Sequence, residues 1–115
     1  MNGIGRKAMA SALVAAALLT APAQAQTQAP SISVLTSCAG AVAAHANIDV
    51  LTHPRGASGD WANVLGRILA RMNTMEGIEG MTGRYAASAA RSHWAEQPAA
   101  EREAAATQCR QRFGS

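Results

Sequence analysis

The sequence predicts an all-α protein, a small antiparallel bundle of about four short helices whose first and last helices are joined by a disulfide. Three observations lead to this prediction. From residue 33 onward, apolar and small residues recur at intervals of three and four, the spacing of one helix face. No segment shows a convincing strand pattern. The two cysteines, Cys38 and Cys109, lie near opposite ends of the helical region.

The first 25 residues have the pattern of a secretory signal. Arg6 and Lys7 precede an uncharged, mostly apolar run (AMASALVAAALLT), which Pro22 ends. Small residues then stand at the two positions that a signal peptidase reads, in Ala23-Gln24-Ala25. We expect cleavage after Ala25 and export to the periplasm or the medium. The apolar run is well short of the about 20 residues that a membrane span needs, so no span is expected after cleavage.

Residues 26–32 are expected to form a flexible tail, and residues 33–115 a single helical domain. The first helix is predicted over residues 33–51, with Cys38 on its apolar face. It should stop before His53, because the residue that precedes a proline, here Pro54, is disfavoured in the α conformation. The composition of residues 53–59 (HPRGASG) then indicates a loop.

The second helix is predicted to begin at Asp60, whose carboxylate suits the N-cap position. It is the most amphipathic segment of the chain. One face carries Trp61, Leu65, Ile68, Met72 and Met75, and the other carries Asn63, Arg67 and Arg71. The segment 77–83 interrupts it, because Gly77, Gly80 and Gly83 together penalise a helix strongly. A connector is the simplest reading of this segment, and a hinge or binding loop is the alternative.

The third helix is predicted over residues 83–95, with Thr82 as its cap. Tyr85, Ala89 and His93 share one side of it, and His93 is interpreted as a partly buried structural residue beside Trp94.

Pro98 is predicted to occupy the first position of the last helix. Glu101 and Glu103 stand early in it and Arg110 and Arg112 late, as the helix dipole favours. Gly114 follows its end, and Ala105, Cys109 and Phe113 fall on one face.

Cys38 and Cys109 are predicted to form a disulfide. The stretch Leu35-Thr36-Ser37-Cys38 resembles the box that precedes a lipidated cysteine, but the polar, proline-containing spacer APAQAQTQAPSIS separates it from the apolar run. Lipidation of Cys38 would also leave Cys109 as a lone thiol. Two cysteines in a small exported domain are typical of a bridge, and free thiols are the remaining alternative. For a loop of this length the chain-entropy model gives roughly 4 kcal/mol of stabilisation.

The charge of the mature chain argues against two classes of partner. Removal of Arg6 and Lys7 lowers the net charge from +3 to +1, with eight arginines against seven acids. A nearly neutral chain with interspersed charges lacks the basic stripe of a nucleic-acid-binding protein. It also lacks the polybasic cluster that binds anionic lipid. We therefore expect no nucleic-acid partner, and an unidentified protein partner is the open option.

Candidate metal ligands are few. A weak alternative set comprises His45, His93, Met72, Met75 and Met81, in which the thioethers would suit Cu(I). None of them stands in a known ligand spacing, and core packing explains Met72 and Met75. We predict no metal and no cofactor. Ser92 and His93 are adjacent, so their side chains diverge on a helix, and no catalytic motif is found; an enzyme is not expected.

The resulting expectation is an exported, non-catalytic interaction or stress-related module, and the alternative is a carrier of a metal or small ligand. In plan the chain resembles the small helical proteins with one disulfide that bacteria export, a plan shared by periplasmic acid-stress chaperones. No motif is matched, and the few carboxylates give little means of sensing acid. An anion or acidic-partner site at Arg67 and Arg71 is a further alternative to a solvated face. Neither the partner nor an oligomeric state follows from the sequence.

Overall fold

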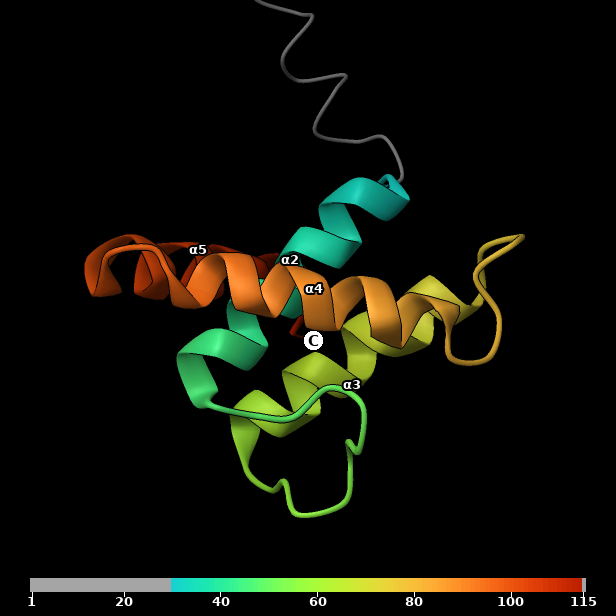
Figure 1. Ribbon diagram of the computed structural model, residues 1–115, viewed down its shortest axis with the longest axis horizontal. Helices are drawn as coiled ribbons and strands as arrows, with labels where there is room; N and C mark the ends of the chain where they lie inside the picture. Colours follow the sequence, from blue (N-terminus) through green and yellow to red (C-terminus); the bar gives the residue numbers. More distant parts are fainter. Residues whose placement is uncertain (1–29, 115) are drawn as a thin grey trace, which may run out of the picture. The chain divides into compact units, whose positions relative to one another are not determined.

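The structure, a computed structural model that describes residues 30–114, contains helices as its only regular elements in that range (Figure 1). They are α2 (Ile32–Ala46), α3 (Asp60–Asn73), α4 (Thr82–Ala95) and α5 (Ala99–Phe113). The predicted all-α class with four helices is therefore confirmed. The predicted signal, residues 1–25, and residues 26–29 of the predicted tail lie outside the described residues. None of the described helices has both the length and the apolar character of a membrane span.

The first described helix, α2, is the centre of the domain and contacts each of the other three helices. Every residue from Cys38 to Ala43 is buried, all the way around the helix. A helix that is apolar all round needs neighbours on all sides. In Figure 1, α4 crosses in front of α2, and α5 lies behind α4. The small side chains of α2 thus serve as the common packing surface for the whole domain.

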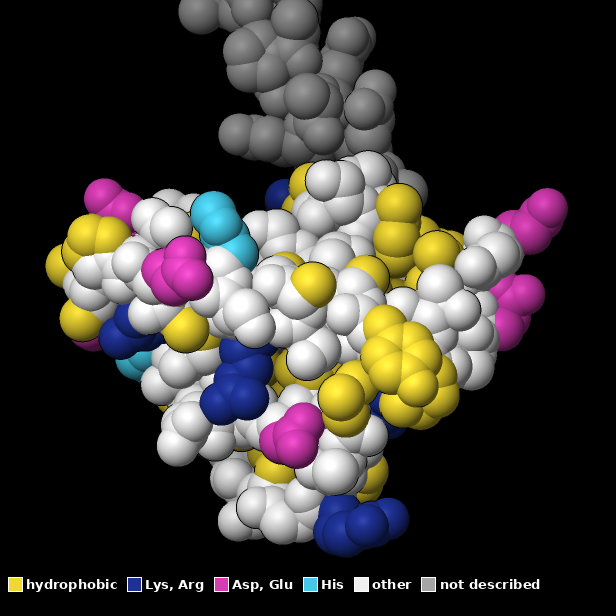
Figure 2. Space-filling view, in the orientation of Figure 1, with side chains coloured by type: hydrophobic (Ala, Val, Ile, Leu, Met, Phe, Trp, Pro, Cys, Tyr) yellow, Lys and Arg dark blue, Asp and Glu magenta, His cyan; other side chains and the backbone are white. Residues whose placement is uncertain are grey.

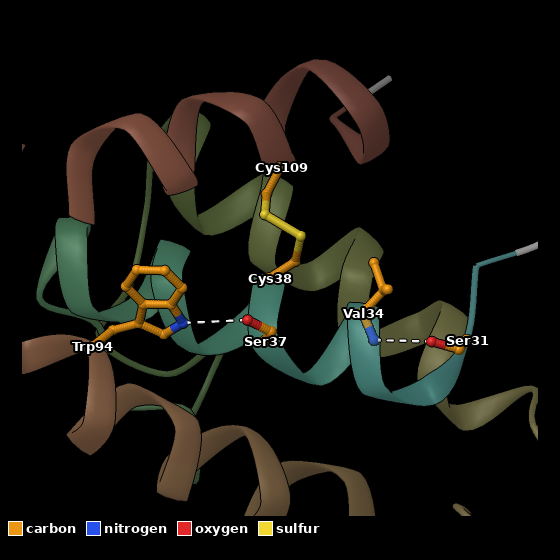
Figure 3. The surroundings of a disulfide bond; sticks show 6 residues. All are labelled: Ser31, Val34, Ser37, Cys38, Trp94 and Cys109. Atoms are coloured by element: carbon orange, nitrogen blue, oxygen red, sulfur yellow. Dashed lines mark hydrogen bonds between the residues drawn. A yellow bond between two sulfur atoms is a disulfide. The ribbon is translucent and has the colours of Figure 1, made fainter. Parts of the chain in front are cut away.

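The start of α2 agrees with the sequence, but its end does not. The hydroxyl of Ser31 caps the helix by accepting a hydrogen bond from the backbone N–H of Val34 at 3.2 Å (Figure 3). The helix stops at Ala46, so the predicted extension to residue 51 was wrong. Asn47 takes the left-handed conformation with φ 57°, which a short polar side chain tolerates and which ends many helices. Residues 47–59 form a loop that leads to α3.

The predicted apolar face of α3 is confirmed. Leu65, Ile68 and Met72 are fully buried, and Trp61 and Met75 are partly buried against the core. The polar face is exposed, as expected for Asn63, Arg67 and Arg71. The predicted cap was wrong, because the N-cap residue is Gly59 and Asp60 is the first helical residue.

The segment between α3 and α4 makes two tight turns. Gly77 has φ 85° and Gly80 has φ 66°, values that other residues rarely adopt. Ile78 lies between them and packs against the core. Gly83 is buried inside α4, where a Cβ atom would lie 3.3 Å from Cε of Met72. The segment is thus a connector anchored by one apolar side chain.

The buried face of α4 is opposite to the one that its large residues suggest. Gly83 and Ala87 are buried, whereas Tyr85, Ala89 and His93 share an exposed face. The prediction that His93 is partly buried was therefore wrong. Thr82 is the first helical residue and does not cap the helix, since Met81 is the N-cap residue. Small residues let α4 approach α2 closely, and this close packing decides which face is buried.

The last helix, α5, follows the sequence closely. Pro98 is the N-cap residue and not, as predicted, the first helical residue, which is Ala99. Gly114 is the C-cap residue. Cys109 and Phe113 are buried, and Ala105 is half-buried, which confirms the predicted face. The helix thereby presents Cys109 to α2.

Candidate functional site

The bridge between Cys38 and Cys109 fastens α5 to the centre of the domain (Figure 3). The Cα atoms of the two cysteines are 5.5 Å apart, within the usual range for a disulfide. Both residues are buried. The predicted disulfide is confirmed, and the sulfur that a lipid would need on Cys38 is already bonded. Beside the bridge, Nε1 of Trp94 donates to Oγ of Ser37 at 3.4 Å, which links α4 to α2.

The weak metal-ligand set of the sequence is divided between different parts of the domain. Met72 is fully buried and Met75 packs on the core next to it, whereas Met81 is 41% exposed. His93 and Met81 stand at opposite ends of α4, twelve residues or about 18 Å apart. Among residues 30–114, no three His, Cys, Asp or Glu side chains are grouped to hold a metal ion.

The two remaining histidines make structural contacts. The ring of His45 meets the ring of Trp61 edge to face, with the centroids 4.9 Å apart. Nε2 of His53 lies 2.9 Å from the carbonyl oxygen of Ala62 and so ties the loop 47–59 to α3. His45 thus joins the end of α2 to the first turn of α3, and His53 joins the loop 47–59 to the same turn.

Arg84 is a structural anchor for the loop 47–59, a role that the sequence did not suggest. Its Nη1 donates to the carbonyl oxygen of Val50 at 2.8 Å and to that of His53 at 2.7 Å. Hydrogen bonds from a charged donor are stronger than neutral ones. Arg91 lies seven residues later on α4, and its Nη2 donates to the side-chain Oδ1 of Asn47 at 2.8 Å. The two arginines that the sequence spaced seven apart therefore fasten α4 to the loop at two points.

An apolar patch lies beside this anchor. The large hydrophobic side chains left exposed in the described part of the chain are Leu51, Met81 and Tyr85, at 40%, 41% and 62% exposure. Met81 and Tyr85 are one turn apart at the start of α4, and Leu51 shares a shallow depression of about 570 Å³ with Met81 and Arg84. Figure 2 shows hydrophobic side chains gathered over this end of α4. We call Leu51, Met81 and Tyr85 the apolar patch.

The sequence does not predict this patch, for a local reason. Its pattern predicts a first helix that includes Leu51, and it does not indicate that Tyr85 is exposed. Asn47 is the residue that could indicate the end of the helix, because Asn in the left-handed conformation often ends a helix and changes the direction of the chain. Ile48 and Val50, which follow it, fold back onto the core and are buried. Leu51, the next residue, is left on the surface beside α4.

The chain matches no protein-family model, no curated protein and no solved structure. Its function must therefore be derived from its own residues.

Proposed function

We propose that the protein is an exported, non-catalytic interaction module that binds a protein partner through the apolar patch. The observation that supports this most is the gathering of Leu51, Met81 and Tyr85 on one face. Scattered exposed hydrophobic residues need no explanation, whereas a group of them beside polar residues is typical of an interaction site. Burial of such side chains in a complex would contribute about 25 cal/mol per Å² of apolar surface.

The composition and support of the patch fit this proposal. Tyrosine, methionine and arginine are enriched in protein interfaces. The patch contains Tyr85 and Met81, and Arg84 lies beside it. The two hydrogen bonds from Arg84 hold the loop against α4. A surface that is fixed before binding loses less conformational entropy when the partner arrives.

Export is part of the proposal. The predicted secretory signal supports it, and so does the disulfide, because bridges persist in oxidising compartments such as the bacterial periplasm. We place the mature chain in the periplasm or outside the cell, beginning at Gln26.

Site-specific photo-crosslinking in the exported compartment tests the proposal. A photoreactive phenylalanine analogue replaces Tyr85 in one variant and Ala100, which is exposed at the start of α5, in a control variant. We expect a discrete adduct with one protein from position 85, no such adduct from position 100, and loss of the adduct when Leu51→Ser and Met81→Ser are added. A folded protein that gives the same products from both positions would refute the patch as a binding surface.

A further inference from the structure

Four arginines come together where α3 meets the end of α5. Arg67 and Arg71 belong to α3, and Arg110 and Arg112 belong to the last turn of α5. All four are exposed. We call them the arginine face. It is built on other elements than the apolar patch, which lies on α4 and the loop 47–59.

Contacts with Phe113 and Gly114 at the end of α5 bring three of the four side chains together. Nη1 of Arg67 donates to the carbonyl oxygen of Gly114 at 2.7 Å. The Cζ atoms of Arg71 and Arg112 lie 5.4 and 5.2 Å from the centroid of the Phe113 ring. The buried ring of Phe113 thus contacts two guanidinium groups, one from each helix, and the carbonyl group of the next residue accepts a hydrogen bond from a third.

Arg110 extends the same face toward the start of α3. Its Cζ lies 5.1 Å from the centroid of the Trp61 ring, and its Nη2 lies 3.4 Å from Oδ2 of Asp60. Within the described residues, Asp60 is the one carboxylate within 4 Å of any guanidinium group of the face. Asp60 is itself 78% exposed, and an exposed pair of this kind contributes little. The face therefore has a large excess of positive charge.

The helix dipoles explain only part of this arrangement. Arg71, Arg110 and Arg112 stand in the last turns of their helices, where a cation is favoured. The dipoles do not explain why side chains from two helices meet on Phe113, nor the position of Arg67. Stacking on an aromatic ring restrains a guanidinium group and leaves its N–H edges free to bind an oxyanion in a bidentate manner.

We propose that the arginine face binds an acidic segment of a protein, whose Asp or Glu carboxylates pair with the guanidinium groups. A hollow of about 520 Å³ adjoins the face and is lined by Trp61, Thr107, Arg110, Gln111 and Gly114. The hydroxyl of Thr107 and the amide of Gln111 suit hydrogen bonds with a peptide backbone, and the Trp61 ring suits an apolar side chain. This mixture fits a peptide better than a membrane surface.

The charge distribution also favours a peptide. A lipid surface is usually bound by four to eight basic side chains that reach outward. Here three of the four guanidinium groups lie on rings of the domain itself. The proposal does not depend on the apolar patch. If one of the two surfaces binds no partner, the proposal for the other surface still stands.

Binding of a labelled peptide of six glutamates to the full, oxidised protein tests the proposal, with six glutamines as the control peptide. We expect saturable binding of the acidic peptide only, weakened about tenfold by Arg71→Gln and by Arg112→Gln. Arg55→Gln removes the same charge from the exposed loop and should change the affinity less than about twofold. Arg112→Lys keeps the charge but loses the planar fork, and should also weaken binding.

Three results would overturn the proposal: no saturable binding, an equal loss in Arg55→Gln, or full binding by Arg112→Lys. Tighter binding of inorganic phosphate or of phosphatidylglycerol vesicles than of the peptide would also overturn it, in favour of a phosphate site. Unfolding midpoints of all variants, measured in parallel, show whether each remains folded.

Discussion

Gly40 of α2 lies directly against Ala90 of α4. A Cβ atom at position 40 would lie 2.5 Å from Cβ of Ala90 and 2.6 Å from its carbonyl carbon, distances that real side chains do not reach. The two backbones therefore touch at this crossing. Since α2 contacts each of the other helices in residues 30–114, the distance between α2 and α4 affects the packing of the whole domain.

Replacement of Gly40 by alanine should destabilise the domain. The new methyl group would meet backbone atoms, which cannot move aside as a side chain can, and overpacking of this kind costs about 1–3 kcal/mol. Gly66→Ala is the matched control within α3. Its methyl group would meet only the ring of His53, at 3.3 Å, and alanine favours a helix over glycine by about 1 kcal/mol.

Urea unfolding measures both changes. We expect a lower free energy of unfolding for Gly40→Ala, and an unchanged or higher one for Gly66→Ala. Equal stability of the two variants would contradict the close crossing of α2 and α4.

Reduction of the bridge should remove much of the stability of the domain. Cys38 and Cys109 are 71 positions apart, and the chain-entropy model gives roughly 4 kcal/mol for such a loop. A domain of this size has little more than that in total. Unfolding with and without dithiothreitol should therefore give very different midpoints. The variant Cys38→Ala/Cys109→Ala should resemble the reduced protein and show no response to the reductant.

Loss of the Arg84 side chain should loosen the loop 47–59. Arg84→Gln removes the donor of two hydrogen bonds, and we expect a loss of about 1–3 kcal/mol in the free energy of unfolding. Amide hydrogen exchange gives the sharper measurement. The amides of Arg55 and Ala57, which bond within the loop, should exchange faster. Arg55→Gln, an exposed change in the same loop, should leave the exchange rate of the Ala57 amide as it is.

Met72 and Met81 should respond very differently to truncation. Met72 is fully buried in the core, so Met72→Ala is expected to cost about 2–5 kcal/mol. Met81 is 41% exposed, and Met81→Ala should stay within about 0.5 kcal/mol of the wild type. If a copper ion stabilised the protein and both variants abolished that effect, the two thioethers would be metal ligands and the carrier hypothesis would replace ours.

The sequence was sufficient to predict the position of a side chain wherever that side chain has only one suitable environment. The face of Leu65, Ile68 and Met72 on α3 and the pairing of the two cysteines were predictable, because apolar periodicity and cysteine number each point to one solution. The end of α2 was not predictable, because the apolar helix pattern continues past Asn47, where the left-handed conformation ends the helix. The buried face of α4 was not predictable either, because close packing against Gly40 buries alanine and glycine and leaves Tyr85 exposed.

The candidate sites were less predictable than the fold, since both combine segments that are distant in the sequence. The apolar patch needs the loop residue Leu51 to lie beside α4. The arginine face needs α5 to bring Arg110 and Arg112 to α3. The stripe of Arg67 and Arg71 follows from the sequence, whereas the position of Arg112 depends on the packing of Phe113 and that of Arg110 on the contact with Trp61.

Intact and native mass spectrometry of the protein from the exported compartment tests the central claim, an exported domain that is closed by one bridge and acts without a cofactor. We expect a chain that begins at Gln26, carries no added metal or small molecule, and has thiols that react with an alkylating agent only after reduction. A chain that retains residues 1–25, thiols that react without reduction, or a reproducible stoichiometric adduct would contradict the account.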